Sequence, residues 1–496
     1  MYRVKIMRIT HIAAEFAPIA KAGGLGEVLT GLCRQLTLEY EDVDVLIPKY
    51  RFISNEFLPN LIQKTPDFEC VEHGISYTNR MWHAEVEGCR LHLLETDHPQ
   101  DYFGRPHIYG YPDDLARFIY FSRAALEYLR LLGRPIDILH LHEWHTAILA
   151  PLVKEDFAKK IEVKSVVFTI HNLEYQGKCA SRDLDAIGMD GSYYLSPSRS
   201  QDPEHPHSIN LMKGAIVYAD AITTVSPSYA KEILTPSFGC NLENTLLKYK
   251  KKLTGILNGI DQKLWNPTAD HYLSAPFSEK DSLVHLHEAK EANRRALAKT
   301  FGLDASKRPW VGAITRLVPQ KGLEMLEEGL EYTVKQGGVF VLLGTSPFEL
   351  IERHFEKLRS KYGGSSALIQ LSYDEALAHR IYASLDFSLI PSLFEPCGLT
   401  QLISMRYGTV PIVRATGGLK DTVFDCDDYT VNARQRNGFI FLQPKEFSTT
   451  LSRAFSLQKQ DPATFQDLMR RGLQFDSSWK KPALQYLKLY RQLADS

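Results

Sequence analysis

Short β-rich apolar runs alternate with longer stretches of helical periodicity through most of this 496-residue chain. The runs occupy residues 44–47, 136–141, 165–169, 221–225, 310–314, 339–343 and 387–390, and a further strand pattern covers residues 4–12. Strands that alternate with helices pair in parallel sheets, and the helices cover the faces of those sheets. The sequence therefore predicts an α/β protein built on parallel sheets.

The length of the chain predicts more than one domain. A chain of 496 residues is too long for a single hydrophobic core, because domains average roughly 150 residues. A break falls near residues 253–261, where an Asn-Gly turn follows a strand and a polar, helix-rich stretch comes next. We predict two large domains, over residues 1–256 and 257–478.

Composition excludes several classes of partner. The 58 basic and 59 acidic residues give a net charge of −1, so no strong field attracts nucleic acid or an anionic membrane. The chain lacks the ~18-residue apolar run that spans a bilayer. Its seven cysteines form no Cys-x-x-Cys pair, which argues against a disulfide framework or zinc knuckle and favours the reducing cytoplasm. Either Met1 or Met7 fits as the first residue.

The segment 391–401 joins a predicted buried strand to an amphipathic helix that ends at Gly408. This places Glu395 and the amides around Gly398 at the carboxyl end of a strand, where open α/β sheets bind ligands. A helix N-terminus at that edge presents N–H groups and partial positive charge to an anion. The segment predicts a site for a phosphorylated ligand.

Two cations follow another predicted strand. Arg316 and Lys321 lie in a proline-containing loop between the strand 310–314 and a helix beginning near Leu323. A guanidinium suits bidentate contact with phosphate oxygens, and a lysine adds a mobile charge. We expect the pair to neutralise a diphosphate at the same sheet edge as Glu395; the alternative is ordinary surface charge.

A paired glycine followed by a helical pattern occurs twice, in residues 20–28 and 415–423. Two glycines let the backbone approach a ligand closely, and the helix start supplies donors. Lys21, beside the first pair, is either a phosphate ligand or a solvated charge flanking a helix. Each paired glycine is otherwise a simple turn into a helix.

Histidines follow two strands of the first domain. His140, His142 and His145 cluster with Glu143, and His171 opens a loop after the strand 165–169. We expect no metal site, because strand alternation separates neighbouring side chains and no helical His-x-x-x-His pair exists. His171 is either a cleft-facing residue or a core histidine.

Motifs distributed along both halves resemble, in their order, those of the bacterial glycogen synthases and plant starch synthases. The motifs are Lys-x-Gly-Gly-Leu at 21–25, His-x-His-x-Trp-His at 140–145, His-Asn-Leu-x-Tyr-Gln-Gly at 171–177, Thr-Thr-Val-Ser-Pro at 223–227, Leu-Asn-Gly-Ile-Asp at 257–261, Arg-Leu-x-x-Gln-Lys-Gly at 316–322, Phe-Glu-Pro-Cys-Gly-Leu-Thr-Gln at 394–401 and Tyr-Gly-Thr-Val-Pro-x-Val-Arg-x-Thr-Gly-Gly-Leu at 407–419.

The resemblance implies the GT-B fold, two Rossmann-like domains facing across a cleft, with a last helix in residues 479–496 that crosses back to the first domain. It implies transfer of glucose from ADP-glucose to the 4-hydroxyl of glycogen or a maltooligosaccharide, with retention of configuration and without a metal or cofactor. UDP-glucose as donor and a catalytically weak glucan-binding homologue are the alternatives. The donor base stays open, because stacking on Tyr373 tolerates adenine and uracil.

The resemblance also implies roles for individual residues. Arg316 and Lys321 would bind the donor diphosphate, Glu395 would face the transferring glucose, and His171 would lie near the sugar 6-hydroxyl. Lys21 would act near the phosphates and Tyr373 would stack on the base. Further nucleotide-sugar contacts are implied for Gly23, Gly24, Asn258, Gln320, Cys397, Gly398, Leu399 and Thr400. Tyr109 matches another cleft position, although the segment 97–114 around it is shorter than is usual in the family.

Three positions depart from the family pattern. Glu143 and Glu27 replace aspartates, and Leu393 replaces an arginine before Phe394. Glu143 would lie near the reaction centre, and one added methylene could shift geometry by about an ångström and cost on the order of a hundredfold in rate. We still expect an active enzyme, since Arg316, Lys321 and Glu395 are retained.

Overall fold

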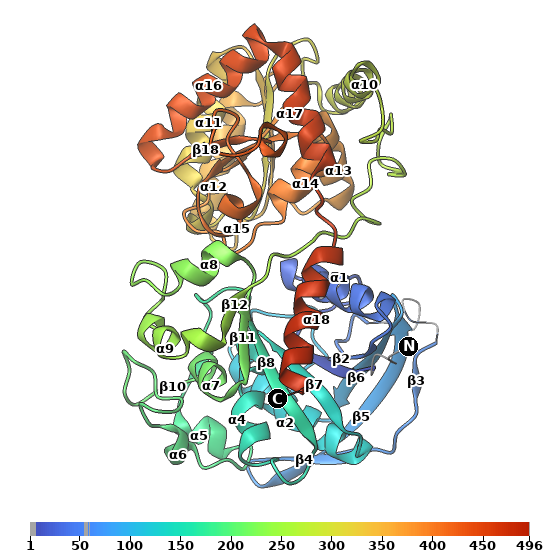
Figure 1. Ribbon diagram of the computed structural model, residues 1–496, viewed down its shortest axis with the longest axis vertical. Helices are drawn as coiled ribbons and strands as arrows, with labels where there is room; N and C mark the ends of the chain where they lie inside the picture. The colour runs from blue at the N-terminus through green and yellow to red at the C-terminus, as the bar shows by residue number, and fades with distance from the viewer. Residues whose placement is uncertain (1–5, 54–57, 59, 496) are drawn as a thin grey trace. The chain divides into compact units, whose positions relative to one another are not determined.

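The computed structural model describes residues 6–53, 58 and 60–495, so the alternative first residue Met1 lies outside the described part (Figure 1). Contacts divide the chain into two compact units. Unit 1 comprises Met1–Gly259 together with Trp479–Ser496, and unit 2 comprises Ile260–Ser478. Each unit contains its own sheet and is described separately.

Unit 1 contains a mainly parallel sheet. Its parallel strands are β1 (Arg8–Ile12), β2 (Asp42–Pro48), β6 (Cys89–Thr96), β7 (Ile136–His142), β8 (Val163–Ile170), β11 (Ala221–Thr224) and β12 (Leu253–Gly255). They are ordered β12-β11-β8-β7-β1-β2-β6 across the sheet. The chain thus builds outward from β1 in one direction, returns to β7 on the other side, and builds outward again.

One edge of this sheet is antiparallel, which the sequence analysis did not predict. β3 (Ile62–Gln63), β4 (Phe68–Glu72) and β5 (Ile75–Val86) extend the sheet beyond β6, and β5 pairs antiparallel with β3, β4 and β6. The two-residue turn between β5 and β6 has positive φ at Glu87 and Gly88. A turn this short can join only antiparallel strands. A separate antiparallel pair forms between β9 (Lys178–Cys179) and β10 (Ile209–Asn210).

Helices cover unit 1 on both sides of the sheet (Figure 1). They are α1 (Gly24–Leu38), α2 (Asp114–Leu132), α3 (Trp144–Ala147), α4 (Leu149–Lys154), α5 (Ser181–Asp185), α6 (Gly191–Tyr194), α7 (Leu211–Tyr218), α8 (Pro227–Glu232), α9 (Glu243–Lys248) and α18 (Lys480–Ala494). Helix α18 packs against α1, β7 and β8 although it ends the chain. Gly31 permits this packing, because a Cβ there would overlap with the indole of Trp479.

Unit 2 contains a fully parallel sheet within the described residues. Its strands are β13 (Trp310–Ile314), β14 (Val339–Leu343), β15 (Ala367–Gln370), β16 (Phe387–Ile390), β17 (Val410–Arg414) and β18 (Phe439–Phe441). Their order is β15-β14-β13-β16-β17-β18. This is the Rossmann-type order, in which the direction of building reverses between β13 and β16.

Strand periodicity divides the apolar residues of unit 2 between two cores. Phe340 and Leu342 of β14 belong to one buried cluster, and Val339, Val341 and Leu343 belong to the other. Alternate side chains of a strand point to opposite faces, so both faces of this sheet are buried under helices. The helices are α10 (Leu283–Phe301), α11 (Leu323–Lys335), α12 (Glu349–Tyr362), α13 (Glu375–Ser384), α14 (Thr400–Arg406), α15 (Gly417–Thr422), α16 (Phe447–Gln460) and α17 (Pro462–Gln474).

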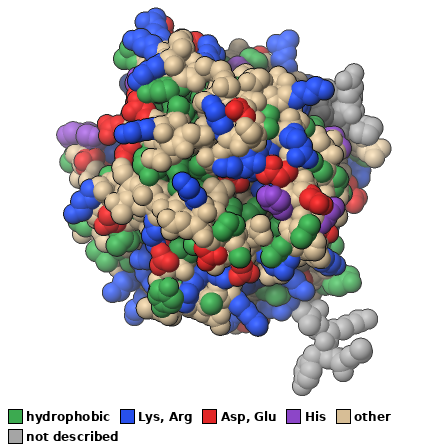
Figure 2. All heavy atoms as spheres, turned by 90° about the horizontal axis from the view of Figure 1, so that it is seen from above, with side chains coloured by type: hydrophobic (Ala, Val, Ile, Leu, Met, Phe, Trp, Pro, Cys, Tyr) green, Lys and Arg blue, Asp and Glu red, His purple; other side chains and the backbone are tan. Residues whose placement is uncertain are grey.

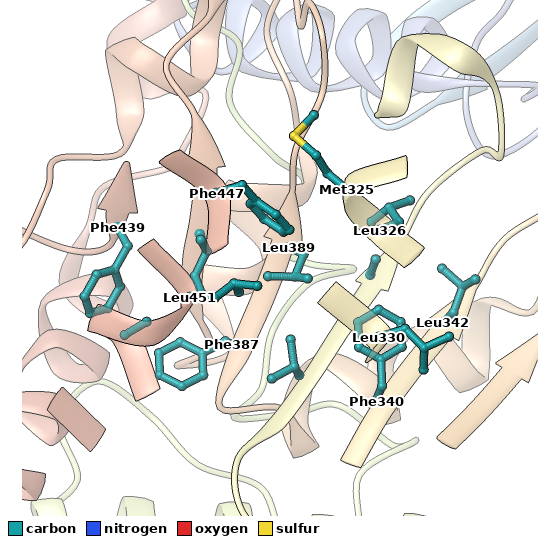
Figure 3. Packing of buried hydrophobic residues seen from close by; sticks show 14 of the residues in the cluster. Met325, Leu326, Leu330, Phe340, Leu342, Phe387, Leu389, Phe439, Phe447 and Leu451 are labelled. Atoms are coloured by element: carbon teal, nitrogen blue, oxygen red, sulfur yellow. The ribbon is translucent and has the colours of Figure 1, made fainter. Parts of the chain in front are cut away.

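Figure 3 shows the first of these cores at the centre of the sheet. Phe387 and Leu389 of β16 lie beside Phe447 and Leu451 of α16, and Leu330 of α11 lies beside Phe340. Burying a side chain of this size contributes roughly 1.5–3 kcal/mol. The apolar packing fixes β16, and with it the polar loop that follows Ile390.

The predicted α/β class and the seven predicted strands are confirmed, with ends within two residues of those observed. The pattern at residues 4–12 forms β1 from Arg8, and its first two residues lie outside the described part. The helices predicted after residues 322 and 398 are α11 and α14.

The described surface carries both signs of charge. On the face shown in Figure 2, lysine and arginine side chains are interspersed with aspartate and glutamate. This mixture agrees with the net charge of −1. Among the described residues, no helix has both the length and the apolar composition needed to cross a membrane.

Candidate active site

Each sheet contains a point where the strand order reverses between two neighbours, β1 and β7 in unit 1 and β13 and β16 in unit 2. The loops that leave the carboxyl ends of such strands diverge and leave a crevice in which α/β proteins bind ligands. Most of the predicted site residues follow these four strands, whereas His171, Asn258 and Tyr373 follow β8, β12 and β15. The two sets are described unit by unit.

In unit 2 the structure brings Lys321 and Glu395 together. Lys321 Nζ lies 2.6 Å from Glu395 Oε2, and Ser392 Oγ donates to the same oxygen at 2.8 Å. Only 8% of Glu395 is exposed. The carboxylate is thus held by one cation and one hydroxyl at the edge of a small hollow that Thr315 and Thr400 also line.

Backbone contacts join the loops after β13 and β16. Gln320 Nε2 donates to the carbonyl of Phe394 at 3.0 Å, and the Leu393 N–H donates to the carbonyl of Gln320 at 2.7 Å. Gly322 has φ +70°, and a Cβ there would overlap with the carbonyl oxygen of Pro391. Gln320 therefore connects the two loops that carry the lysine and the carboxylate.

The second paired glycine packs against the loop of Glu395. Gly417 has φ +45°, and a Cβ there would overlap with the carbonyl oxygen of Glu395. The Gly418 N–H donates to that carbonyl at 3.1 Å, and a Cβ on Gly418 would overlap with the carbonyl of Cys397. In the structure these glycines admit the backbone of residues 395–397, and the close approach of a ligand to them stays a prediction.

Other predicted residues of unit 2 lie around this centre. Arg316 is exposed in the loop after β13. Tyr373 is 74% exposed, and its hydroxyl donates to Glu375 at the start of α13 rather than to the Lys321–Glu395 pair. Cys397, Gly398, Leu399 and Thr400 form the turn into α14, where Gly398 has φ +71°. Their nucleotide-sugar contacts stay predictions.

In unit 1 the loop after β1 is organised by Glu15, which the sequence analysis missed. Glu15 Oε2 accepts hydrogen bonds from the N–H groups of Ala22 and Gly23 at 2.8 and 2.9 Å. Its other oxygen accepts from the hydroxyl of Tyr109 at 2.8 Å. The available signal in the sequence was a carboxylate three residues beyond a predicted strand; in the structure only 3% of Glu15 is exposed.

Lys21 forms an ion pair with Glu27. Its Nζ lies 2.6 Å from Glu27 Oε1, and both side chains are largely buried. Glu27 lies in the first turn of α1, which starts at Gly24 and has Gly23 as its N-cap. The lysine predicted to act near phosphate is thus held over the start of that helix.

Glu143 is bound to the loop that carries His171. Its Oε1 accepts from the backbone N–H groups of His171 and Asn172 at 2.5 and 2.7 Å. Glu143 has φ +65°, a conformation that costs energy and clusters at functional sites. Burial raises the pKa of Glu143 to about 8, against the opposing effect of the backbone N–H groups of Asn172, His171 and Trp144. The carboxyl group is therefore largely protonated at neutral pH and positions the loop.

The histidine cluster differs from the predicted one. His140 and His142 are two residues apart, so they share a face of β7, and their rings stack with centroids 4.2 Å apart. The third member is His11 of β1, the register partner of His140, whereas His145 lies in α3 beside Tyr109. Ring nitrogens of His11, His140 and His142 lie within 4.8 Å of one another.

His171 extends this cluster toward the loop. Its Nε2 lies 3.1 Å from Nδ1 of His142, and burial lowers the pKa of His171 to about 3. The ring is neutral across the physiological range. It can donate or accept a hydrogen bond but supplies no charge.

Two further residues of unit 2 were missed in the sequence. Ser392 binds Glu395, and Arg414 Nη1 at the end of β17 donates to the carbonyl of Leu393 at 2.8 Å. An arginine at the end of a strand in the same sheet was the available signal for Arg414.

The predicted residue Asn258 lies in unit 1, where its buried Oδ1 has no hydrogen-bond partner among the described residues.

The chain is similar to known proteins over both units. Residues 8–248 match the family described as starch synthase catalytic domain. The chain is 43% identical over 497 residues to a glycogen synthase of Protochlamydia amoebophila (strain UWE25), with 98% of this chain and 99% of that protein covered. It is 44% identical over 488 residues to a probable starch synthase 4 of Arabidopsis thaliana, with 97% of this chain but 46% of that longer protein covered.

The same similarity holds for a solved structure. The catalytic domain of starch synthase IV from Arabidopsis thaliana, bound to ADP and acarbose, superposes with a TM-score of 0.94 at 42% identity. The match covers 99% of this chain and 100% of that one.

Proposed function

The chain belongs to the glycogen and starch synthase family of GT-B glucosyltransferases, and we propose that it transfers glucose from ADP-glucose to the non-reducing 4-hydroxyl of an α-1,4-glucan. The observation that carries this proposal is the Lys321–Glu395–Ser392 cluster at the strand-order reversal of unit 2. The bound ADP and acarbose of the Arabidopsis relative support a nucleotide donor and a glucan acceptor.

The donor diphosphate is the group that Lys321 is suited to bind. Its ammonium is paired with a single carboxylate at 2.6 Å, and a diphosphate offers more negative charge to the same cation. Arg316, exposed in the same loop, supplies a second cation. Together they stabilise the charge that develops on the departing diphosphate, which is the main catalytic demand of such a reaction.

Glu395 then faces the transferring glucose. The bond between the anomeric carbon and the diphosphate oxygen breaks, and the acceptor 4-hydroxyl bonds to that carbon from the same face, which retains the configuration. The hydroxyl proton leaves with the departing diphosphate. The carboxylate, held by Ser392 at 2.8 Å, stabilises positive charge on the sugar ring.

The unit 1 residues serve the sugar and the phosphates in this proposal. Glu143 holds the backbone of His171, whose neutral ring approaches the glucose 6-hydroxyl. Glu15 holds the loop of Lys21 by two backbone hydrogen bonds. We assign the acceptor side to residues 1–256, the nucleotide-sugar side to residues 257–478, and to residues 479–496 a helix that crosses back to the first domain.

The remaining predicted contacts and the compartment belong to the same proposal. The contacts are those of Gly23, Gly24, Asn258, Gln320, Tyr373, Cys397, Gly398, Leu399 and Thr400. No disulfide joins the seven cysteines, all of which are described, and this supports a reducing compartment such as the cytoplasm.

Incorporation of labelled glucose into glycogen tests this function. Purified protein is offered ADP-glucose and UDP-glucose in parallel, with Glu395→Gln as the active-site variant and the exposed Glu352→Gln of α12 as the matched control. We expect incorporation mainly from ADP-glucose, retained in the control and reduced at least about a hundredfold in Glu395→Gln. Glycogen binding without incorporation from either donor would instead identify a glucan-binding protein.

A further inference from the structure

Three histidine rings of unit 1 form a continuous chain from the His171 loop into the buried sheet. His171 Nε2 lies 3.1 Å from His142 Nδ1, and His142 Nε2 lies 3.0 Å from His11 Nδ1. We propose that His142 and His11 are positioning residues that fix the proton of His171 on Nδ1, so that this ring presents an N–H donor to a sugar oxygen. The contact of this N–H with a sugar oxygen rests on the proposed function.

Each ring in the chain is neutral. Burial lowers the pKa of His11 and of His171 to about 3, and it lowers the pKa of His142 well below its usual value, with neighbouring histidines adding to the effect. A neutral imidazole carries one N–H and one lone pair. The proton positions in the three rings are therefore coupled.

Only two arrangements satisfy both contacts. His142 uses both nitrogens, so one must donate and the other must accept. In the outward arrangement, His11 donates to His142, His142 donates to His171, and the proton of His171 is on Nδ1. In the inward arrangement every donor is reversed, and Nδ1 of His171 is a lone pair.

The buried end of the row of histidine rings, at His11, favours the outward arrangement. His11 Nε2 is buried and has no hydrogen-bond partner among the described residues. The inward arrangement would place an N–H at this position, and the outward arrangement places a lone pair there. Orphaned buried N–H groups are rarer in proteins than unsatisfied acceptors. The proton of His171 therefore belongs on Nδ1.

Neighbouring groups hold the rings in this geometry. His140 stacks on His142 with an interplanar angle of 29°. Its own nitrogens contact Tyr490 Oη at 2.7 Å and Thr169 Oγ1 at 2.5 Å. Glu143 fixes the backbone of His171, so both the backbone and the ring of this residue are constrained.

A metal ion is the rival explanation for clustered histidines. The ligand atoms of His11, His140 and His142 lie within 4.8 Å of one another. However, the rings of His140 and His142 are stacked at an interplanar angle of 29°, and each of their four nitrogens has a hydrogen-bonding partner. The contacts favour shared protons over a shared cation.

Nitrogen NMR of unliganded, histidine-labelled full-length protein tests the proton positions directly. We expect His11, His142 and His171 to carry the proton on Nδ1, with signals assigned by their loss in single variants. A proton on Nε2 of His171 would overturn the proposal, and so would stoichiometric zinc that chelation removes from these rings. This measurement uses no substrate, so its failure is distinguishable from failure of glucan synthesis.

Two substitutions of one residue test the positioning role. The Asn side chain in His142→Asn places an amide where Nδ1 was and keeps the contact with His171, whereas Gln in His142→Gln places it near Nε2 and keeps the contact with His11. Both variants lose the same ring stacking, so they form a matched pair. His83→Asn, in β5, is the control for loss of a partly buried histidine.

We expect His142→Gln to lower kcat by about tenfold and His142→Asn by no more than about threefold, the difference expected for one hydrogen bond. His83→Asn should keep full activity. Equal losses in both His142 variants, with equal melting temperatures, would show that the ring acts only by packing and would overturn the positioning role.

Discussion

The two lysines predicted to meet the donor are each paired with a glutamate within the protein. Lys321 contacts Glu395 at 2.6 Å and Lys21 contacts Glu27 at 2.6 Å. These pairs hold long, flexible side chains in place, which reduces the ordering that ligand binding requires. Binding a diphosphate then exchanges one anionic partner for another instead of ordering a free lysine.

Replacing Lys321 by alanine should impair turnover far more than folding. The variant loses the cation that stabilises the leaving group, so we expect kcat to fall by about 10²–10³-fold. Lys335→Ala, at the other end of α11, is the matched control and should keep normal kcat. Steady-state kinetics with melting curves checks this; near-normal kcat in Lys321→Ala with an unchanged melt would remove the assigned role.

The buried Glu143 gives stability a pH dependence of its own. Its folded pKa of about 8 exceeds the reference of 4.5, so between these values the folded state keeps a proton that the unfolded state releases. Stability from this residue therefore falls as pH rises through that window. Glutamine in Glu143→Gln retains an oxygen for both backbone donors and removes the titration.

We therefore expect Glu143→Gln to gain stability relative to the parent protein as pH rises from 5 to 8, by at most about 1.4 kcal/mol per pH unit. Urea unfolding of both proteins across this range measures the difference. A difference that stays constant with pH would show that Glu143 is already ionised in the folded state.

At the scale of elements, the site depends on loops that contact other loops. The turn at Gly417 and Gly418 packs on the backbone of residues 395–397, and Gln320 bonds to Phe394. These contacts join the loops after β13, β16 and β17. The position of Glu395 is therefore set by three segments that are far apart in the sequence.

Adding a methyl group at Gly417 should disturb this arrangement. Gly417→Ala combines an unfavourable positive φ with overlap on the Glu395 carbonyl, whereas Gly302→Ala has a positive φ and open space around the new Cβ. Backbone strain alone costs roughly 1–3 kcal/mol. We expect Gly417→Ala to lose clearly more stability than Gly302→Ala, measured by denaturant unfolding, and to lose activity as well. Equal losses of stability would mean that residues 395–397 shift to make room for the new Cβ.

The sequence predicted elements better than contacts between them. The strands before Arg316 and Glu395 were confirmed because apolar runs and helix starts are local signals. The antiparallel edge at β5 was missed because its side chains are half-buried and alternate weakly. His11 was missed as a partner of His140 because strand pairing joins residues 129 positions apart, and periodicity within one strand carries no register.

At the scale of the whole molecule, buried histidines are concentrated in unit 1. Burial lowers the pKa values of His11, His140, His142, His145 and His171. A histidine that stays neutral when folded but takes a proton when unfolded contributes stability above its usual pKa of about 6.5, and this contribution is lost as pH falls. Glu143 acts in the opposite direction but is one group against five.

Mild acid should therefore weaken unit 1 before unit 2. Some carboxyl groups of unit 2, such as those of Asp386 and Asp270, have a lowered pKa. Their protonation affects the stability of unit 2 only in more acidic solution. Hydrogen exchange at pH 7.0 and 5.5, corrected for intrinsic rates, should show loss of protection confined mainly to unit 1. Equal loss in both units would contradict this expectation.

Helix α18 gives the order of synthesis a consequence for folding. Unit 1 begins the chain, yet it includes Trp479–Ser496 from the end of the chain, and Tyr490 of α18 is the partner of His140. Domains usually fold as they emerge from the ribosome, the N-terminal one first. Here the first domain to emerge cannot be completed until residues 479–496 have followed all of unit 2, whereas unit 2 is contiguous in the chain and can fold as soon as it emerges.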